Sequence, residues 1–380
     1  MRLLSIAAAV CLVSQTALPV ISSAEPEHTK PVLTDIEPEA EMLYVEQETY
    51  SDYYDTYIND PRPDKEILIQ GTSFLMKENS DGEGISVGSC GSDYGLENKD
   101  NVLIWNAADG RISYEVDVPE TGSYCLEFSY LPIPSNMANI EFSIEIDGKV
   151  PYDTASRATL NKVYVNDGDI TLDSRGNQVR PSQKQTGMWM LKPLMDVDGL
   201  FNEPLQFHFE KGKHEISFDI NKGYFALEYF RLYNPEGLTD YTSYKNSIQT
   251  SVTPESTPST LIRIEGENAA YKSDSTLYPT ADNSSYLASP SNPSKTVYNT
   301  IGSGNWKQAL QTVTWIVPAE ELQGDGWYKI GIKARQNEMR GFYSNRRVYI
   351  DGEVPGEELN QVKFYYDTNW QTVMPTDANG

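Results

Sequence analysis

Cysteine and histidine are scarce in this chain of 380 residues, which contains three of each. His28, His208 and His214 lie far apart, and no G-x-S-x-G, H-E-x-x-H, C-x-x-C or phosphate-binding glycine loop is present. The sequence therefore predicts a protein that is not an enzyme. A glycosidase-type carboxylate pair stays open, because 55 acidic residues make chance pairs common.

Lysine and arginine are too few for a nucleic-acid partner. Thirty of them face 55 acidic residues, for a net charge of −25, whereas nucleic acids and anionic membranes attract clustered positive charge. Long apolar runs are also lacking, except at the N-terminus. There Arg2, the apolar run Leu3–Val13 and Ser22-Ser23-Ala24 predict a secretory signal peptide over residues 1–24, and so an extracellular or cell-surface protein.

The cysteines leave the redox state open. Cys11 lies in the predicted signal peptide. The bulky Val10 before it does not fit the lipobox of a lipoprotein, so cleavage near Ala24 is expected. Export permits Cys90 and Cys125 to form a disulfide. Two separate thiols are the alternative.

Helical periodicity is largely missing, and alternation of apolar and polar residues takes its place. Ile112–Val118, Phe142–Ile146 and Ile216–Ile220 alternate with period two, which is typical of strands with one buried face. Asp147-Gly148 and Asp351-Gly352 indicate hairpin turns. These patterns predict an all-β protein built as a β-sandwich.

One segment occurs twice. Ile146–Pro151 (IDGKVP) recurs as Ile350–Pro355 (IDGEVP), Ile112–Tyr130 parallels Val313–Ala334, and Leu172–Gly176 is aligned with Thr376–Gly380. The second copy stops there, without a counterpart of 177–233. We therefore expect two tandem sandwiches, the second truncated, in an incomplete chain, and poor stability of residues 261–380 alone.

The chain divides at changes of composition. The predicted parts are a signal peptide (1–24), an acidic, Tyr-rich lead segment (25–63), a first sandwich (64–235), a second lead segment with a Ser/Thr/Pro linker (236–260), and a second, incomplete sandwich (261–380). The second lead, Thr239–Ile248, resembles Ser51–Ile58, where a short helix ending before Pro61 is expected.

Three segments carry a family resemblance. Val118-Pro119 followed by Gly122-x-Tyr124 resembles a hallmark of galactose-binding-like sandwiches of jelly-roll type. Ile264–Asn268 and Phe209–Ile216 resemble the opening strand and closing hairpin of family 6 and family 35 carbohydrate-binding modules. The tandem order of these elements is similar to the N-terminal half of bacterial extracellular solute-binding proteins of sugar ABC transporters.

The resemblance implies function and partners. It implies a secreted, non-catalytic protein that binds polysaccharide or oligosaccharide and meets an ABC transporter permease through a C-terminal domain outside this chain. Two alternatives stay open: the modules could serve a glycoside hydrolase or lyase, or be structural or protein-docking sandwiches.

Candidate ligand-binding residues are tryptophans and asparagines near turns, because sugar recognition needs an exposed ring with polar groups beside it. They are Trp105, Asn106, Trp189, Asn305, Trp306 and Trp370. Trp315 and Trp327 are expected in the core. Asn177, Arg180 and Gln183 fit either a ligand loop or a structural loop.

The resemblance also implies a structural calcium in the second sandwich. Glu265 and Glu267 occupy its E-x-E ligand position, and carboxylate oxygens suit Ca²⁺. Gln70 and Thr72 stand at the matching positions of the first sandwich, where no calcium is expected.

Overall fold

The computed structural model describes residues 47–79, 82–135, 139–248, 261–322 and 326–376. The predicted signal peptide, Cys11 and the first part of the lead segment lie outside these ranges. No helix within them is long and apolar enough to cross a membrane.

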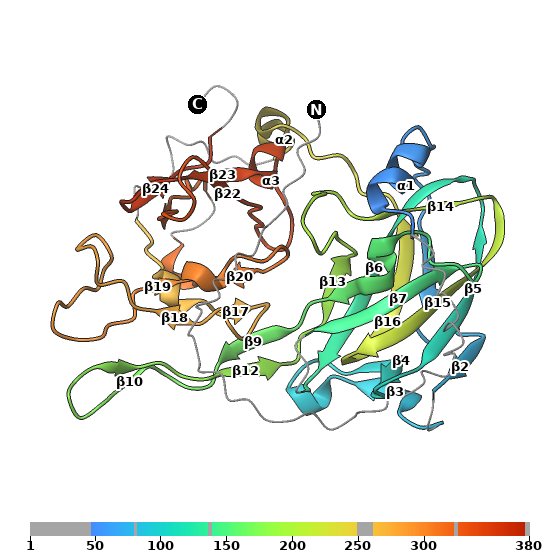
Figure 1. Ribbon diagram of the computed structural model, residues 1–380, viewed down its shortest axis with the longest axis horizontal. Coiled ribbons are helices and arrows are strands. Elements are labelled where there is room, and N and C mark those ends of the chain that lie inside the picture. Colours follow the sequence, from blue (N-terminus) through green and yellow to red (C-terminus); the bar gives the residue numbers. More distant parts are fainter. Residues whose placement is uncertain (1–46, 80–81, 136–138, 249–260, 323–325, 377–380) are drawn as a thin grey trace, which may run out of the picture. The chain divides into compact units, whose positions relative to one another are not determined.

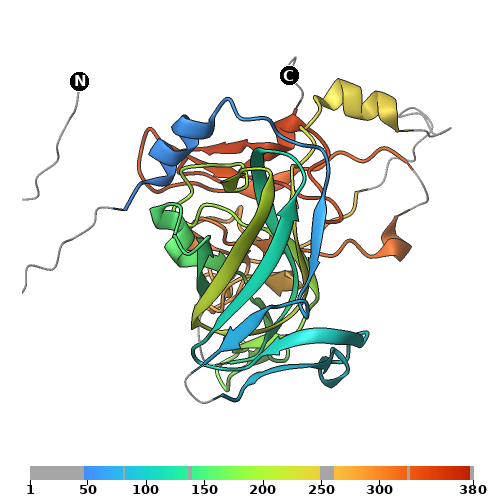
Figure 2. The same cartoon turned by 90° about the vertical axis from the view of Figure 1, so that its right-hand side faces the viewer.

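Two antiparallel sheets form the first sandwich (Figures 1 and 2). One has seven strands: β1 (Ile67–Gln70), β3 (Ile85–Cys90), β4 (Lys99–Trp105), β6 (Gly122–Ile133), β13 (Met190–Pro193), β14 (Gln206–Phe209) and β16 (Tyr224–Tyr233). The other has five: β2 (Met76–Glu78), β5 (Arg111–Val118), β7 (Ile140–Ile146), β8 (Ala158–Leu160) and β15 (Gly212–Lys222). The predicted β-sandwich is confirmed.

Aromatic rings fill the space between these sheets. Phe128 and Phe230 come from the seven-stranded sheet, Phe142 and Phe218 from the other, and all four are at most 3% exposed. Their centroids lie 5.1 to 5.8 Å apart for the closest pairs, mostly edge to face. Burying each ring contributes about 1.5–3 kcal/mol, so this cluster carries much of the stability of the first sandwich.

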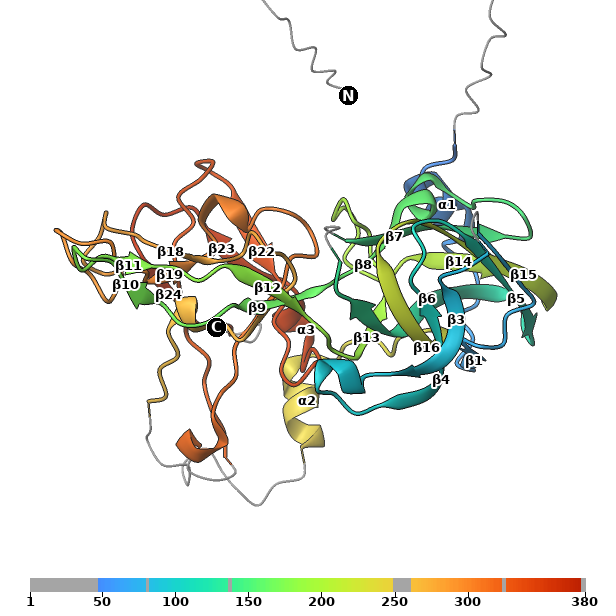
Figure 3. The same ribbon diagram turned by 90° about the horizontal axis from the view of Figure 1, so that it is seen from below.

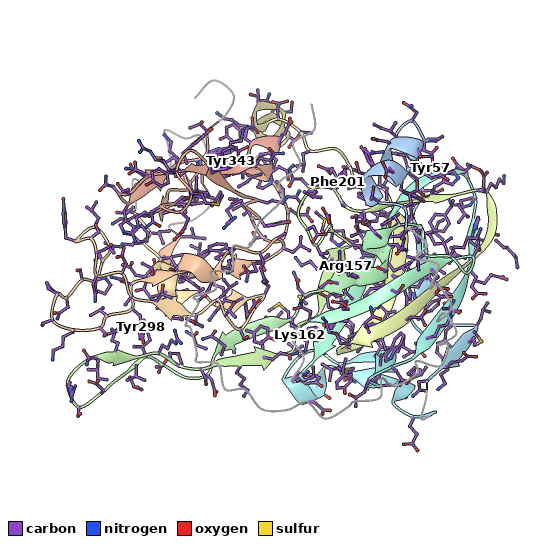
Figure 4. The ribbon with its side chains drawn as sticks, in the orientation of Figure 1. Tyr57, Arg157, Lys162, Phe201, Tyr298 and Tyr343 are labelled. Carbon is purple, nitrogen blue, oxygen red and sulfur yellow. The ribbon has the colours of Figure 1, made fainter. Side chains whose placement is uncertain are left out.

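Helix α1 (Tyr50–Tyr57) belongs to this core. Thr49 caps it, and the hydroxyls of Tyr50 and Tyr53 accept hydrogen bonds from the backbone N–H groups of Gln206 (3.0 Å) and His208 (2.7 Å) on β14. Two tyrosines one helical turn apart thereby satisfy alternate N–H groups of an edge strand, which would otherwise be open to pairing. Figure 4 labels Tyr57 of this helix and Phe201, whose ring meets Tyr50 edge to face at 4.8 Å. The first sandwich therefore includes residues before 64.

The second lead segment makes one backbone contact that matches a contact of the first, although its helix buries no residue. Helix α2 (Tyr241–Ser247) follows Thr239, whose carbonyl accepts from Glu357 N at 2.9 Å at the start of α3 (Glu357–Asn360). In the first sandwich the Glu48 carbonyl accepts from Asp153 N at 2.8 Å. The similarity of the two lead segments is thus structural.

Cys90 and Cys125, the cysteines within the described residues, are free thiols. Cys125 is 1% exposed, and burial raises its pKa to about 12. A thiol with so high a pKa is not a nucleophile.

Short strand pairs make up the second module, by which we mean the described residues from 261 to 376. They are β18 (Pro279–Thr280) with β19 (Thr300–Ile301), β21 (Ile332–Ala334) with β24 (Gln371–Val373), and β22 (Tyr343–Arg346) with β23 (Val362–Tyr365). A four-stranded antiparallel sheet joins β17 (Tyr271–Lys272) and β20 (Val313–Thr314) to β9 (Val163–Asn166) and β12 (Gln183–Thr186). The turn between β9 and β12 carries β10 (Thr171–Leu172) and β11 (Gln178–Val179).

The repeat holds at the level of strand register. Ile140 faces Leu160 in β7–β8, and Ser344 faces Phe364 in β22–β23, each 204 positions later. The turns match as well: Asp147 and Asp351 have φ of 52° and 50°, each followed by a glycine with positive φ. Asp and Gly tolerate this left-handed region, so the predicted turns are confirmed.

The sequence alignment matches Leu172–Gly176 with Thr376–Gly380, of which residues 377–380 lie outside the described residues; the strand pairing before them supports a different correspondence. Met190 of β13 faces Tyr130 of β6, and Gln371 of β24 faces Ala334 of β21. Strand β24 therefore corresponds to β13. The β9–β12 hairpin, which contains Leu172, is an insertion in the first half of the chain.

Few apolar side chains are buried in the second module. Within its described residues they are Ala269, Leu277, Ala288, Val362 and Phe364. Trp315 and Trp327 are half-buried and lie outside the strands, so their prediction as core residues is wrong. Phe342 and Tyr365 are 60% and 66% exposed. This scarcity of core residues supports the expectation of poor stability for this part alone.

Candidate functional site

A pocket of about 460 Å³ opens in the second module between β21, β23 and β24. Polar side chains and aromatic rings line it together: Arg335, Gln336, Lys363, Asp367, Asn369 and Gln371, with Phe364, Tyr365 and Tyr366. A hollow that combines rings with hydrogen-bonding groups is the usual form of a small-molecule site.

The tyrosine that fills one position of the first sandwich has no counterpart ring at the pocket. In the first sandwich Tyr130 is fully buried, and its hydroxyl donates to the carbonyl of Asn161 at 2.9 Å. By register, Ala334 takes the place of Tyr130, and Tyr365 that of Asn161. Both Ala334 and Tyr365 line the pocket. The space that a tyrosine fills in one repeat is therefore open in the other.

Trp370 lies between two residues of the pocket lining, Asn369 and Gln371, and is not itself part of that lining. Its Nε1–H donates to Asp282 Oδ2 at 2.8 Å, and Arg335 Nη2 lies 3.0 Å from the same oxygen. The Arg335 guanidinium also lies 5.4 Å from the centre of the Trp370 ring and donates to Ser284 Oγ at 2.8 Å. These contacts fix the orientation of the indole.

The charge on Asp282 is well supported. Burial raises the pKa of Asp282, but hydrogen bonds from Ser284 and Trp370 and the charge of Arg335 outweigh it, so the pKa is lowered. The carboxylate stays ionised at neutral pH and holds both Trp370 and Arg335.

Asp367 orients two other residues of the pocket lining, Asn369 and Gln371. Its carboxylate accepts from Asn369 N at 2.8 Å and from Gln371 Nε2 at 3.0 Å. At the rim, the exposed rings of Tyr343 and Tyr365 lie 5.6 Å apart, and Figure 4 labels Tyr343. Oriented amides, a carboxylate and open ring faces suit a ligand rich in hydroxyl groups.

The equivalent place in the first sandwich is apolar. Trp189 precedes β13 as Trp370 precedes β24, but it packs against Val102, Leu131 and Ala226. Leu131 corresponds to Arg335. Trp189 is half-buried, with Lys99 Nζ 4.6 Å from its ring centre. The geometry therefore favours the second module as the binding module.

The other candidates lie away from the pocket. Trp105 is 1% exposed and stacks on Phe225, so its prediction as a ligand platform is wrong, because no face of the ring is open. Asn106 next to it is exposed. Asn305 and Trp306 are half-buried around a short 3-10 turn, with Arg346 4.9 Å from the Trp306 ring. None of the six candidates lines the pocket, and Trp370 lies between two residues that do, Asn369 and Gln371.

The predicted calcium ligands differ in environment. Glu265 is paired with Arg263 at 2.8 Å, whereas Glu267 is 6% exposed and its Oε2 has no partner among the described residues. No cluster of three or more His, Cys, Asp or Glu side chains that could hold a metal occurs in the described part of the chain. The orphaned oxygen of Glu267 fits a cation, and Glu265 would have to release Arg263 to join it.

Replacing Glu267 by glutamine tests this carboxylate. Burial, with the charge of Glu265, raises the pKa of Glu267. Its stabilising contribution is therefore complete below its unfolded pKa and is lost as pH rises through the raised folded value. In calcium-free buffer at pH 7 we expect Glu267→Gln to raise the free energy of unfolding by about 1–2 kcal/mol, because an unpaired buried charge is removed.

Thermal unfolding with and without calcium completes that test. We expect added calcium to stabilise the parent chain and not Glu267→Gln. Equal stability of the two proteins in both buffers would show that Glu267 neither costs stability nor binds a cation.

Sequence reasoning missed Arg335, Asp282 and Asp367. One signal was available in the alignment of the repeats. Tyr130-Leu131 aligns with Ala334-Arg335, so a large ring is replaced by a methyl group and an apolar side chain by a charged one. Asp282 has no such signal, because it comes from the loop after β18.

No protein-family model matches the chain, and no curated protein matches it. Among solved structures it is similar to a family 35 carbohydrate-binding module from Clostridium thermocellum, at 13% identity over 45% of this chain and 99% of that one, with a TM-score of 0.26. It is also similar to a family 6 module of Cellvibrio mixtus lichenase 5A in complex with cellotriose, at 14% identity over 45% and 98%, with a TM-score of 0.24.

An enzyme is matched over part of its length. Arthrobacter globiformis T6 isomalto-dextranase, complexed with panose, is 13% identical over 46% of this chain and 24% of that chain, with a TM-score of 0.28. The function of the pocket is therefore taken from its own residues.

Proposed function

We propose that this protein is a secreted, non-catalytic carbohydrate-binding protein, the front part of an extracellular solute-binding protein that serves sugar uptake. The ligand is an oligosaccharide or the end of a polysaccharide, held in the pocket of the second module. A further, C-terminal domain would bind the permease of an ABC transporter. The order of the tandem sandwiches and their lead segments supports this wider context.

The observation that carries the proposal is the pocket itself, in which oriented polar side chains such as Arg335 and Asp367 stand beside aromatic rings. Trp370 is oriented by Asp282 and Arg335, and Asp367 orients two further polar groups on the wall. Sugars are bound by ring faces together with fixed donors and acceptors. Each of these carboxylates is already engaged in hydrogen bonds that fix its neighbours, which suits binding.

Trp370→Ala is expected to lower the affinity for oligosaccharide about 10-fold, or about 1.4 kcal/mol, because the indole packs against Arg335, which lines the pocket. Isothermal titration calorimetry measures the effect. Trp306→Ala is the matched control, since it removes the same ring outside the pocket and should leave the affinity unchanged. Equal loss in both variants, or none in either, would place the sugar elsewhere.

A further inference from the structure

The inserted hairpin of the first sandwich reaches the second module. Strands β9 and β12 are paired, with Val163 opposite Thr186 and Asn166 opposite Gln183. On its other edge β9 pairs with β17, where Tyr164 lies opposite Lys272. Strand β17 continues to β20, so one four-stranded sheet contains strands from both halves of the chain. Figure 1 shows β9 next to β17, and Figure 3 shows the hairpin from below.

A buried lysine lies at this junction. Lys272 is 1% exposed, and its Nζ donates to Asn166 Oδ1 at 2.6 Å and to Gln183 Oε1 at 2.9 Å. Both acceptors are neutral amide oxygens on the hairpin. Desolvation lowers the pKa of Lys272 to about 8. Removing either oxygen would take a hydrogen-bond acceptor from the buried amine, and a buried donor without an acceptor lowers the stability of the fold.

The far end of the hairpin makes a second set of contacts. The Arg180 guanidinium lies 3.5 Å from the centre of the Tyr278 ring. Gln178 N donates to the Thr296 carbonyl at 2.9 Å, and Tyr298 N donates to Gln178 Oε1 at 2.6 Å. Tyr298 is labelled in Figure 4. Asn177 Oδ1 also accepts from Thr296 N. Arg180, Asn177 and Gln183 therefore serve a structural junction, the second of the two interpretations left open by the sequence.

We propose that the hairpin Val163–Thr186 is a donor that completes the second module, and that β17, Tyr278 and residues 296–298 form its acceptor surface. The hairpin adds two strands to a sheet that otherwise has only two short ones, β17 and β20. The second module has little core of its own, so this addition supplies much of its order. The proposal concerns folding and does not rest on sugar binding.

The partner that the acceptor fits is defined by chemistry. It is a β-hairpin that presents two amide oxygens to Lys272 and a guanidinium to Tyr278. Such recognition combines main-chain pairing with a few side-chain contacts, as in strand addition to a sheet edge. The insertion is absent from the described second repeat, which has no hairpin between β23 and β24.

Hydrogen exchange on the full chain tests the junction. In Gln183→Ala, the amides of β17 and β20 are expected to exchange at least ~10-fold faster than in the parent chain, while those of β6 and β15 are unchanged. Lys184→Ala is the matched control, because Lys184 neighbours Gln183 on β12 but is exposed. It should leave β17 and β20 protected.

A second experiment uses addition in trans. A full chain in which residues 165–184 are replaced by Gly-Gly should lose protection in β17 and β20, and a synthetic peptide of residues 161–188 should restore it. The proposal is overturned if Gln183→Ala exchanges like the parent, or if the shortened chain keeps full protection without the peptide. A peptide that fails to restore lost protection would likewise contradict an acceptor specific for the hairpin.

Discussion

Ala334→Tyr is expected to abolish oligosaccharide binding, with a loss of affinity of more than about 100-fold. The substitution introduces the residue that the first repeat has at the same register position, where Tyr130 is fully buried. A phenol at position 334 would extend toward Tyr365 as Tyr130 extends toward Asn161. It would occupy the space that the ligand needs.

The free energy of unfolding of Ala334→Tyr distinguishes a filled pocket from a misfolded chain. The ring enters existing space, so the free energy of unfolding should stay within about 1 kcal/mol of the parent or rise. Ala334→Ser is the matched control, because it changes the strand without filling the pocket, and it should bind normally. Calorimetry that shows full binding by a folded Ala334→Tyr chain would exclude this pocket as the site.

Tyr130→Ala is expected to lower the free energy of unfolding of the first sandwich by about 3–5 kcal/mol, the range for removing a large buried ring. Tyr130 is fully buried, and its hydroxyl hydrogen bond to Asn161 is lost as well. The same position that lines a cavity in one repeat is thus a stability residue in the other.

Tyr130→Phe separates the two contributions. It keeps the ring and removes only the hydroxyl, so chemical denaturation should show a loss of about 1 kcal/mol. A change below 1 kcal/mol for Tyr130→Ala would mean that the repeats do not differ at this position as the register indicates.

The fold could be predicted because its signals are local. Period-two alternation in Ile112–Val118 and Phe142–Ile146 identified strands β5 and β7, and Asp147-Gly148 identified the turn that follows. The end of the second repeat could not be aligned correctly. An inserted hairpin shifts the spacing between β8 and β13, and only strand pairing shows which later segment takes the place of β13.

The site was predicted only in the neighbourhood of Trp370, whose neighbours Asn369 and Gln371 line the pocket. A tryptophan beside a turn can face either way, and Trp105 shows the difference: it ends β4 on the buried side and stacks on Phe225. Which face is buried depends on the partner sheet, which the sequence of one strand does not specify. Asp282 and Arg335 could not be joined to Trp370 from sequence, because 88 positions separate the carboxylate from the indole it holds.

Titration of the intact chain with neutral gluco-, manno- and xylo-oligosaccharides, followed by calorimetry, tests the central claim most directly. The two repeats differ at Tyr130 and Ala334, so we predict one binding site per chain for the sugar that is recognised. Heat from two equivalent sites per chain, or no binding across these sugars, would contradict the assignment of carbohydrate binding to the second module.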